Sequence, residues 1–362
     1  MNIDLLKRLC ETPGVPGREE RVRALIEKEI KDLFDSTETD PMGSLICRRN
    51  PRAGKGKSKS GTKKPAKNDR PTRVMLLCHM DEIGFYVSHI DAKGFLWLNN
   101  AGGFDARNLF SRRVLVVTDS GEFKGVMNPS GRPVHISSPD ERSKVPELKT
   151  FCVDVGMDAK EAKKLIKVGD YVVMDEPAIE VGEKFVSKAL DNRVACWLGI
   201  EAVRAIDKAG SDHDCEIYVS FTVQEEVGLR GAHTSSFGVE PDIGIGIDVT
   251  LACDTPGVPD DEAVSVHGRG AVLHVMDSSF ISDYRLIREL DEVAKKKRIP
   301  AQRSILARGG LDDAAAQQAR AGARAVGITV GTRYIHTVTE MIDLNDLSAA
   351  RDLLAAWVPT IA

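Results

Sequence analysis

The sequence lacks the features that mark a membrane protein or a secreted one. It contains no run of 18 or more apolar residues, so we expect no transmembrane helix. The first residues, MNIDLLKRLCETPG, carry charges throughout and show no apolar signal-peptide core. The seven cysteines are scattered and form no CxxC pair, which favours reduced thiols over a disulfide framework. We therefore expect a cytoplasmic protein.

The charges that are present are distributed unevenly. Residues 48–73 hold eleven Lys and Arg against one acid, Asp69. Because the whole chain has a net charge of −4 and this segment one of +10, the remainder carries −14. A basic segment can bind nucleic acid. However, it has no aromatic residue and no hydrophobic period, so we expect a disordered basic loop at 52–73, for which a nucleic-acid partner is the weaker interpretation.

Apolar periodicity divides the 362 residues into three parts. Residues 1–87 combine two amphipathic helices, at about 3–10 and 18–33, with short apolar runs. Residues 88–180 consist of short strands broken by Gly, Pro, Asn and Asp, which is typical of a small β-rich module. Residues 181–362 alternate helices with strands. This pattern predicts one helix-flanked α/β domain, built from both ends of the chain and interrupted by the β module.

Residues of the types that bind metals follow the apolar runs. VMLLCHMD ends on His79 and Asp81, which share a face of an extended chain, and a carboxylate beside a histidine suits an orienting partner. GIGIDVT closes on Asp248, and His336 follows the run VGITV. SKALDNRVAC offers Asp191, which alone could simply cap a helix. Since helix-flanked sheets place their sites at the carboxyl ends of strands, these residues are candidates for one site.

The stretch FTVQEEVGLRGA places Glu225 beside Glu226 at a predicted strand end. Like charges side by side repel, but bound dications would offset that cost. Neighbours in an extended chain point to opposite faces, so one carboxylate could bind metal while the other faces a water between metals. Two histidines with several carboxylates fit a two-metal hydrolytic site for zinc, cobalt or manganese better than a structural zinc site, which favours cysteine.

These motifs resemble those of the tetrahedral aminopeptidases, which are cytoplasmic dinuclear metallo-aminopeptidases also labelled endoglucanase-like or cellulase M. The resemblance runs nearly end to end, and HMDEIGF and QEEVGLRGA are its most specific motifs. It implies an α/β fold in which a helix-flanked mixed sheet, similar to that of zinc exopeptidases, carries an inserted small β-barrel-like dimerisation domain. It also implies a homo-oligomer, because family members assemble dimers into twelve-subunit tetrahedra.

The resemblance assigns a role to each candidate residue. His79 and Asp248 would bind one divalent metal ion, Glu226 and His336 would bind the other, and Asp191 would bridge both. Zinc is the expected metal, with cobalt and manganese as alternatives.

The implied activity is removal of N-terminal residues from short peptides by a two-metal-activated water. Glu225 would act as the general base and acid, and Asp81 would orient His79. The sequence departs from the family pattern at Leu311 and Asp313, and it lacks a proline before the Arg-Tyr pair that precedes His336. The preferred N-terminal residue therefore cannot be carried over.

Three alternatives remain. A related dinuclear amidohydrolase or deacylase would use the same ligands. A glycosidase needs two carboxyl groups flanking one bond, roughly 5–9.5 Å apart, which adjacent glutamates on a strand cannot provide. A nucleic-acid-binding protein would use residues 48–73, and its binding would weaken steeply with salt.

Overall fold

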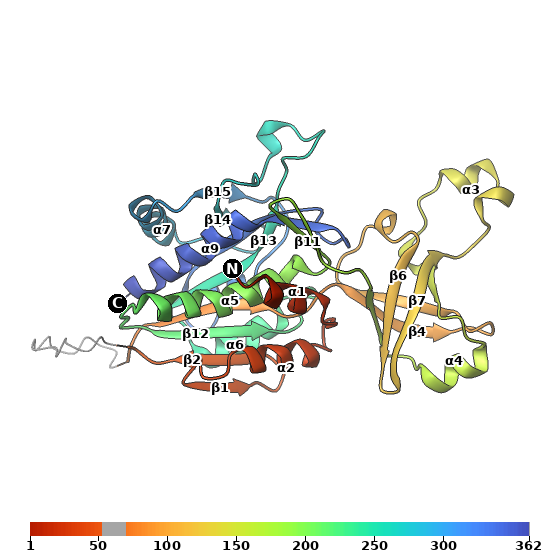
Figure 1. Cartoon of the computed structure of the whole chain (residues 1–362), viewed down its shortest axis with the longest axis horizontal. Coiled ribbons are helices and arrows are strands. Elements are labelled where there is room, and N and C mark those ends of the chain that lie inside the picture. The colour runs from red at the N-terminus through yellow and green to blue at the C-terminus, as the bar shows by residue number, and fades with distance from the viewer. Residues whose placement is uncertain (53–69, 362) are drawn as a thin grey trace, which may run out of the picture.

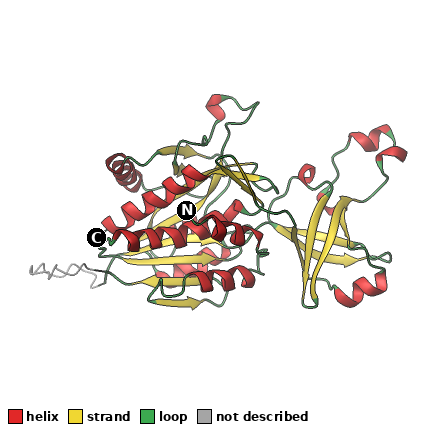
Figure 2. Cartoon of the chain, viewed as in Figure 1, coloured by secondary structure: helices red, strands yellow, loops and turns green. Residues whose placement is uncertain are grey.

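A computed structural model describes residues 1–52 and 70–361 of the chain (Figure 1). The predicted disordered loop at 52–73 falls mostly on residues 53–69, which lie outside the described residues. The described chain forms a sheet flanked by helices and, beside it, a separate β-barrel (Figures 1 and 2). The predicted α/β fold with an inserted barrel-like module is thereby confirmed.

The sheet has eleven strands, of which nine follow the order β1-β2-β12-β3-β13-β16-β17-β11-β10, while β14 pairs with β16 and β15 pairs with β14. Its strands are β1 (Ser36–Thr39), β2 (Leu45–Arg49), β3 (Arg73–His79), β10 (Ile179–Val181), β11 (Lys184–Ser187), β12 (Glu216–Thr222), β13 (Ile243–Leu251), β14 (Ala271–Met276), β15 (Ala301–Ile305), β16 (Arg324–Arg333) and β17 (Glu340–Asp343).

The four central strands, β12, β3, β13 and β16, run parallel to one another. Helices cover both faces of this region, which explains why these strands read as continuous apolar runs rather than as alternating ones. Along β3, Leu76 and Cys78 pack into the core on one face while Met75 and Leu77 pack into the core on the other. Because the strands are parallel, their carboxyl ends lie at a single edge of the sheet.

Two groups of helices cover the sheet (Figure 1). The larger core includes residues of α1 (Ile3–Glu11), α2 (Glu20–Glu29), α5 (Leu190–Ala209), α7 (Tyr284–Lys297) and α9 (Leu344–Trp357). On the other face α6 (Arg230–Val239) packs with α8 (Asp313–Gln317). The second predicted helix is shorter than expected, because α2 ends at Glu29 and residues 31–33 form a turn. No helix in the described ranges is long and apolar enough to cross a membrane.

The barrel closes in the order β4-β5-β8-β7-β6-β9 and has a hydrophobic core of its own. Its strands are β4 (Gly84–Ile90), β5 (Leu96–Ala101), β6 (Arg112–Thr118), β7 (Gly121–Pro129), β8 (Phe151–Asp154) and β9 (Tyr171–Met174). Two short helices, α3 (Pro139–Ser143) and α4 (Ala159–Leu165), lie in its connections. The predicted border at residue 88 falls inside β4, because Gly84 already pairs with Ala101.

Candidate active site

The carboxyl edge of the parallel strands brings the predicted ligands together. His79 is the last residue of β3, and the Glu225–Glu226 pair follows β12. Within the described part of the chain, two groups of side chains place ligand atoms within 4.8 Å of one another. The groups are His79, Glu225 and Asp248, and Asp191, Glu226 and His336.

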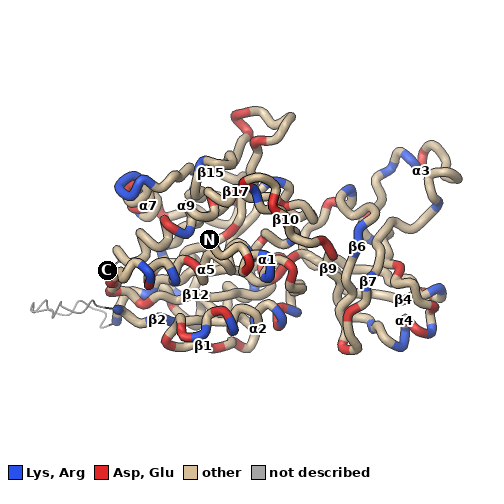
Figure 3. Tube along the Cα trace, in the orientation of Figure 1, with Lys and Arg blue, Asp and Glu red and all other residues tan. Residues whose placement is uncertain are grey.

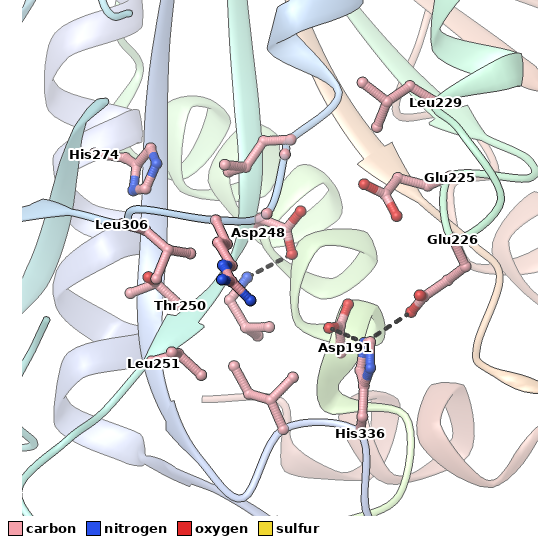
Figure 4. A pocket seen from close by; sticks show the side chains of 16 residues that line it. Asp191, Glu225, Glu226, Leu229, Asp248, Thr250, Leu251, His274, Leu306 and His336 are labelled. Carbon is pink, nitrogen blue, oxygen red and sulfur yellow. Dashed lines mark hydrogen bonds and ion pairs between the residues drawn. The ribbon is translucent and has the colours of Figure 1, made fainter. Parts of the chain in front are cut away.

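Asp191 connects the two groups through His79 and His336, and Figure 4 shows its pair with His336. Its Oδ1 lies 3.3 Å from His79 Nε2, and its Oδ2 lies 3.3 Å from His336 Nε2. The backbone of Asp191 and Asn192 is not helical, although both residues fall within the first turn of α5. Asn192 caps the regular helix, because its Oδ1 accepts a hydrogen bond from Ala195 N at 2.9 Å. The Asp191 carboxylate is therefore free to face the histidines.

The two glutamates do not lie on a strand, contrary to the sequence-based expectation. β12 ends at Thr222, and Gln224 has a positive φ of 56°, which ends the extended run. In the loop that follows, Asp81 accepts hydrogen bonds from the backbone N–H groups of both Glu225 and Glu226, each at 3.1 Å. The pair is thus positioned by a buried carboxylate rather than by strand pairing.

The side chains of the pair nevertheless separate as expected. Glu225 Oε2 lies 3.8 Å from His79 Nε2, whereas Glu226 Oε1 lies 3.5 Å from His336 Nε2. Figure 4 shows the two carboxylates reaching toward different parts of the site. Each glutamate therefore belongs to a different ligand group.

Asp248 lies inside β13 rather than at its end, where the sequence placed it. Pairing with β16 continues along the strand as far as Leu251 and Thr332, so the extended chain does not stop at the carboxylate. Asp248 Oδ2 lies 3.9 Å from His79 Nε2, and its Oδ1 accepts a hydrogen bond from Val249 N at 2.7 Å.

Asp81 contacts the far side of the His79 ring. His79 Nδ1 lies 3.2 Å from the backbone oxygen of Asp81 and 3.5 Å from its Oδ1, so Nε2 faces the site. Asp81 is fully buried. Fixing one imidazole nitrogen in this way leaves the other as a directed ligand.

The donor set fits divalent metal ions. It consists of imidazole nitrogens and carboxylate oxygens, which suit zinc, cobalt and manganese. His79 Nε2 and Glu226 Oε1 are buried and have no hydrogen-bond partner among the described residues. The Cys196 thiol donates to the backbone oxygen of His79 at 3.3 Å, and neither ligand group found among the described residues includes a cysteine.

Comparison with known proteins agrees with this geometry. The sequence profile of the M42 glutamyl aminopeptidases matches residues 60–353. The chain belongs to the M42 aminopeptidase family. M42 enzymes are metallopeptidases, so the chain is a metal-dependent peptide hydrolase.

Individual M42 relatives match over nearly their whole length. A putative aminopeptidase of Acetivibrio thermocellus is 35% identical, covering 97% of this chain and 96% of the relative. The structure of the aminopeptidase APDkam598 from Desulfurococcus kamchatkensis is 34% identical in sequence and has a TM-score of 0.88. The match covers 99% of this chain and 94% of the APDkam598 chain. The Pyrococcus horikoshii TET1 peptidase, described as assembling into a tetrahedron or a large octahedral shell, has 29% identity and a TM-score of 0.83, with 98% of each chain covered.

Burial and the repulsion between neighbouring carboxylates shift the pKa values of the side chains in this site. Burial raises the pKa of Glu225 and of Asp248 well above the usual range, with neighbouring carboxylates adding to the effect. Burial also opposes ionisation of Asp191, but its close contacts with the His336 and His79 rings hold its pKa below the usual range. Burial alone would lower the pKa of His336. The carboxylates of Asp191 and Glu226 outweigh this effect and raise the pKa of His336 to about 12. A buried excess of carboxylates of this kind is what bound cations neutralise.

Sequence reasoning missed three buried carboxylates around this site. Glu340 contacts the backbone of Asp191 and His336, and Glu19 accepts a hydrogen bond from Gln224 N at 3.0 Å. Asp312 accepts a hydrogen bond from the Thr222 hydroxyl. Burial is the first cause that raises the pKa of each, to about 8 for Glu340, about 7 for Glu19 and about 6 for Asp312. No spacing pattern marks them as site residues, because each accepts a hydrogen bond from a residue far away in the sequence.

A cavity of about 570 Å³ opens from the M42 site (Figure 4). His274 and Leu306 lie on the opposite side of this cavity from Glu226 and His336. Six apolar side chains line it: Leu229, Val249, Leu251, Leu306, Leu311 and Ile335.

The barrel approaches the same site through the connection after β5. A Cβ added to Gly102, whose φ is 93°, would lie 3.3 Å from Glu226 Oε2, and one added to Gly103 would lie 3.5 Å from His336 Nδ1. The glycines of the AGGF motif therefore let the backbone pass close to the ligands.

Proposed function

We propose that this M42 chain is an aminopeptidase that removes N-terminal residues from short peptides with the help of two divalent metal ions. One observation carries the proposal: the two oxygens of Asp191 lie 3.3 Å from the Nε2 atoms of two different histidines. A carboxylate placed in this way can bridge two cations, with His79 and Asp248 on one side and Glu226 and His336 on the other. Zinc, cobalt and manganese all accept such ligands.

When bound, the two ions supply an acidified water and polarise the peptide carbonyl. The protein's own contribution is proton transfer and orientation. Glu225 is a member of the ligand group of His79, but the proposed bridge through Asp191 does not require it. We therefore assign to Glu225 the proton taken from the water and returned to the leaving amine. Asp81 holds the backbone of Glu225 and the ring of His79 together, which fixes the base relative to one ligand.

The cavity indicates which N-terminal side chains fit. Its walls beyond the ligand groups are mainly apolar, and Arg308 is the only Lys or Arg among the described residues that line it. A long aliphatic side chain can bury itself there. A lysine side chain would meet the charge of Arg308, and the acids among the described residues that line the cavity all belong to the two ligand groups. We therefore expect leucine derivatives to be cleaved best and lysine derivatives least. Arg308→Ala should reduce cleavage of glutamate derivatives while sparing that of leucine derivatives.

The decisive experiment separates the roles of the two glutamates. Glu225→Gln keeps the shape but removes the base, so kcat on leucine p-nitroanilide should fall by about 10²–10⁴-fold with both metals still bound. Glu226→Gln removes a charged ligand, so one metal should bind more weakly and added metal should recover part of the activity. Elemental analysis measures the metal content of each variant, and the kinetics measure its kcat. Loss of metal in Glu225→Gln, with both metals retained in an inactive Glu226→Gln, would reverse the assignment.

Metal removal and substrate choice test the reaction class. Chelation should abolish cleavage of leucine p-nitroanilide, and zinc, cobalt or manganese should restore it; full activity in metal-free protein would refute the proposal. An aminopeptidase requires a free α-amine, so N-acetyl-leucine p-nitroanilide should not be cleaved. Release of acetate from N-acetyl-leucine would instead identify the related deacylase, which the ligands alone allow.

Two further features of the chain bear on its partners. The P. horikoshii TET1 peptidase forms closed shells, and we infer that this chain also assembles with copies of itself, using the barrel. Lys and Arg are interspersed with Asp and Glu on both the sheet part and the barrel (Figure 3). A nucleic-acid partner would therefore depend on the basic segment at 48–73.

A further inference from the structure

Glu340 contacts two predicted metal ligands at once. It lies at the start of β17 and is only 2% exposed. Its Oε2 accepts a hydrogen bond from Asp191 N at 3.0 Å, and its Oε1 accepts one from His336 N at 2.7 Å. A single side chain therefore joins two residues that are far apart in the sequence.

Both of these residues need support from outside their own segments. Asp191 has non-helical backbone angles at the irregular start of α5. His336 lies in the connection between β16 and β17 and has a φ of 64°, a backbone conformation that residues other than glycine rarely adopt. Such backbone conformations persist where the surroundings hold them in place. Hydrogen bonds from two N–H groups to one carboxylate are strong enough to do so.

We propose that Glu340 is a positioning residue that holds Asp191 and His336 in register and thereby sets the affinity of one of the two cation sites. The proposal rests on the two-metal function proposed above. The site that includes Glu226 and His336 should depend on it most, because Glu340 holds two of the residues assigned to that site. The other site shares only the bridging Asp191, since Glu340 contacts neither His79 nor Asp248 in the structure. Removing a group that supports a metal ligand typically costs about 10–100-fold in metal affinity or activity.

Zinc titration by calorimetry tests the proposal on protein first treated with chelator. In Glu340→Ala, one zinc should bind about 10–100-fold more weakly than in the wild type, while the other, which shares only Asp191, should lose less affinity. Glu340→Gln keeps one acceptor oxygen, so its loss should be smaller; it also serves if the alanine variant does not fold.

Asp343→Asn is the matched control on the same strand. Asp343 is 3% exposed, pairs with Lys184 and accepts a hydrogen bond from Asn345 N at 2.7 Å, but it contacts no predicted ligand. Its substitution should lower stability and leave both zinc affinities intact. If Asp343→Asn weakens zinc binding as much as Glu340→Ala does, the effect is a general one and the proposal is wrong.

Amide hydrogen exchange gives a readout that needs no metal. In metal-free protein, the amides of Asp191 and His336 should exchange faster in Glu340→Ala than in the wild type or in Asp343→Asn. Unchanged exchange at both amides overturns the proposal. A wild-type protein that takes up no zinc would instead count against the proposed function, and the exchange measurement would still decide the role of Glu340.

Discussion

Replacing Lys188 by methionine tests a buried ion pair at the junction of the sheet and the barrel. Lys188 Nζ lies 2.8 and 2.6 Å from the two oxygens of Glu82, and the two side chains are only 6% and 3% exposed. Glu82 precedes β4, where the chain enters the barrel, and Lys188 follows β11, where it has returned to the sheet. The pair therefore ties the segment that enters the barrel to the segment between β11 and α5.

The expected loss follows from what remains around Glu82. Removing one partner of a buried pair leaves an uncompensated charge and costs about 3–5 kcal/mol in free energy of unfolding. Arg193 Nη2 remains 3.4 Å from Glu82 Oε1, and Gly14 N donates to the same oxygen at 3.3 Å. We therefore expect the lower end of the range, about 3 kcal/mol.

Urea unfolding provides the assay, with circular dichroism as the signal. At an m value of about 3 kcal/mol per molar, this loss lowers the midpoint by roughly 1 M. The double variant Glu82→Gln with Lys188→Met should recover part of the stability, because the unpaired carboxylate is gone. Lys149→Met removes an exposed pair and should change nothing measurable. If Lys188→Met unfolds like the wild type, Glu82 carries no charge and the reasoning is refuted.

Three further predictions concern other parts of the chain. The hydrogen bonds from Arg333 lower the pKa of Asp254 to about 2, so the stability this pair contributes is present above pH 4 and is lost as the pH falls through about 2; acid unfolding of Asp254→Asn should lack this dependence. Replacing residues 53–69 by a short Gly-Ser linker should leave kcat/KM within a few-fold, since the segment has nothing to bury; a loss of orders of magnitude would contradict this. Light scattering at micromolar concentration should show an oligomer, and Val134→Asp with Ile136→Asp, which charges two exposed barrel residues, should reduce its size; a strictly monomeric wild type would count against assembly.

The sequence was sufficient to select the side chains that the structure brings together, but not to predict the backbone conformation around them. His79, Asp191 and His336 each had an ordinary structural explanation when taken alone, and the motifs that resemble those of the tetrahedral aminopeptidases selected them together. Where β12 and β13 end could not be read, because the end of a strand depends on pairing with its neighbours. Pairing with β16 keeps β13 extended past Asp248. In contrast, the left-handed backbone conformation of Gln224 ends the extended segment before the two glutamates.

The supporting carboxylates were hidden for a different reason. Glu19 and Glu340 accept hydrogen bonds from backbone N–H groups far away in the sequence, and such contacts require no residue type at a fixed spacing. The fold class was more accessible. Alternating helices and apolar runs indicated the covered sheet, and short strands broken by Gly, Pro, Asn and Asp indicated the β module. Closure of that module into a barrel was implied only by the family resemblance.

The order in which the chain is made has a consequence for the metal centre. The first ligand group is complete once residue 248 has been synthesised, but the second waits for His336, which follows the strand β16. Contacts between segments so far apart in sequence close late in folding, because chain entropy opposes them until most of the structure has formed. In the proposed two-metal centre, the second cation would therefore bind last, and a chain interrupted before β16 would lack His336 and with it one complete ligand group.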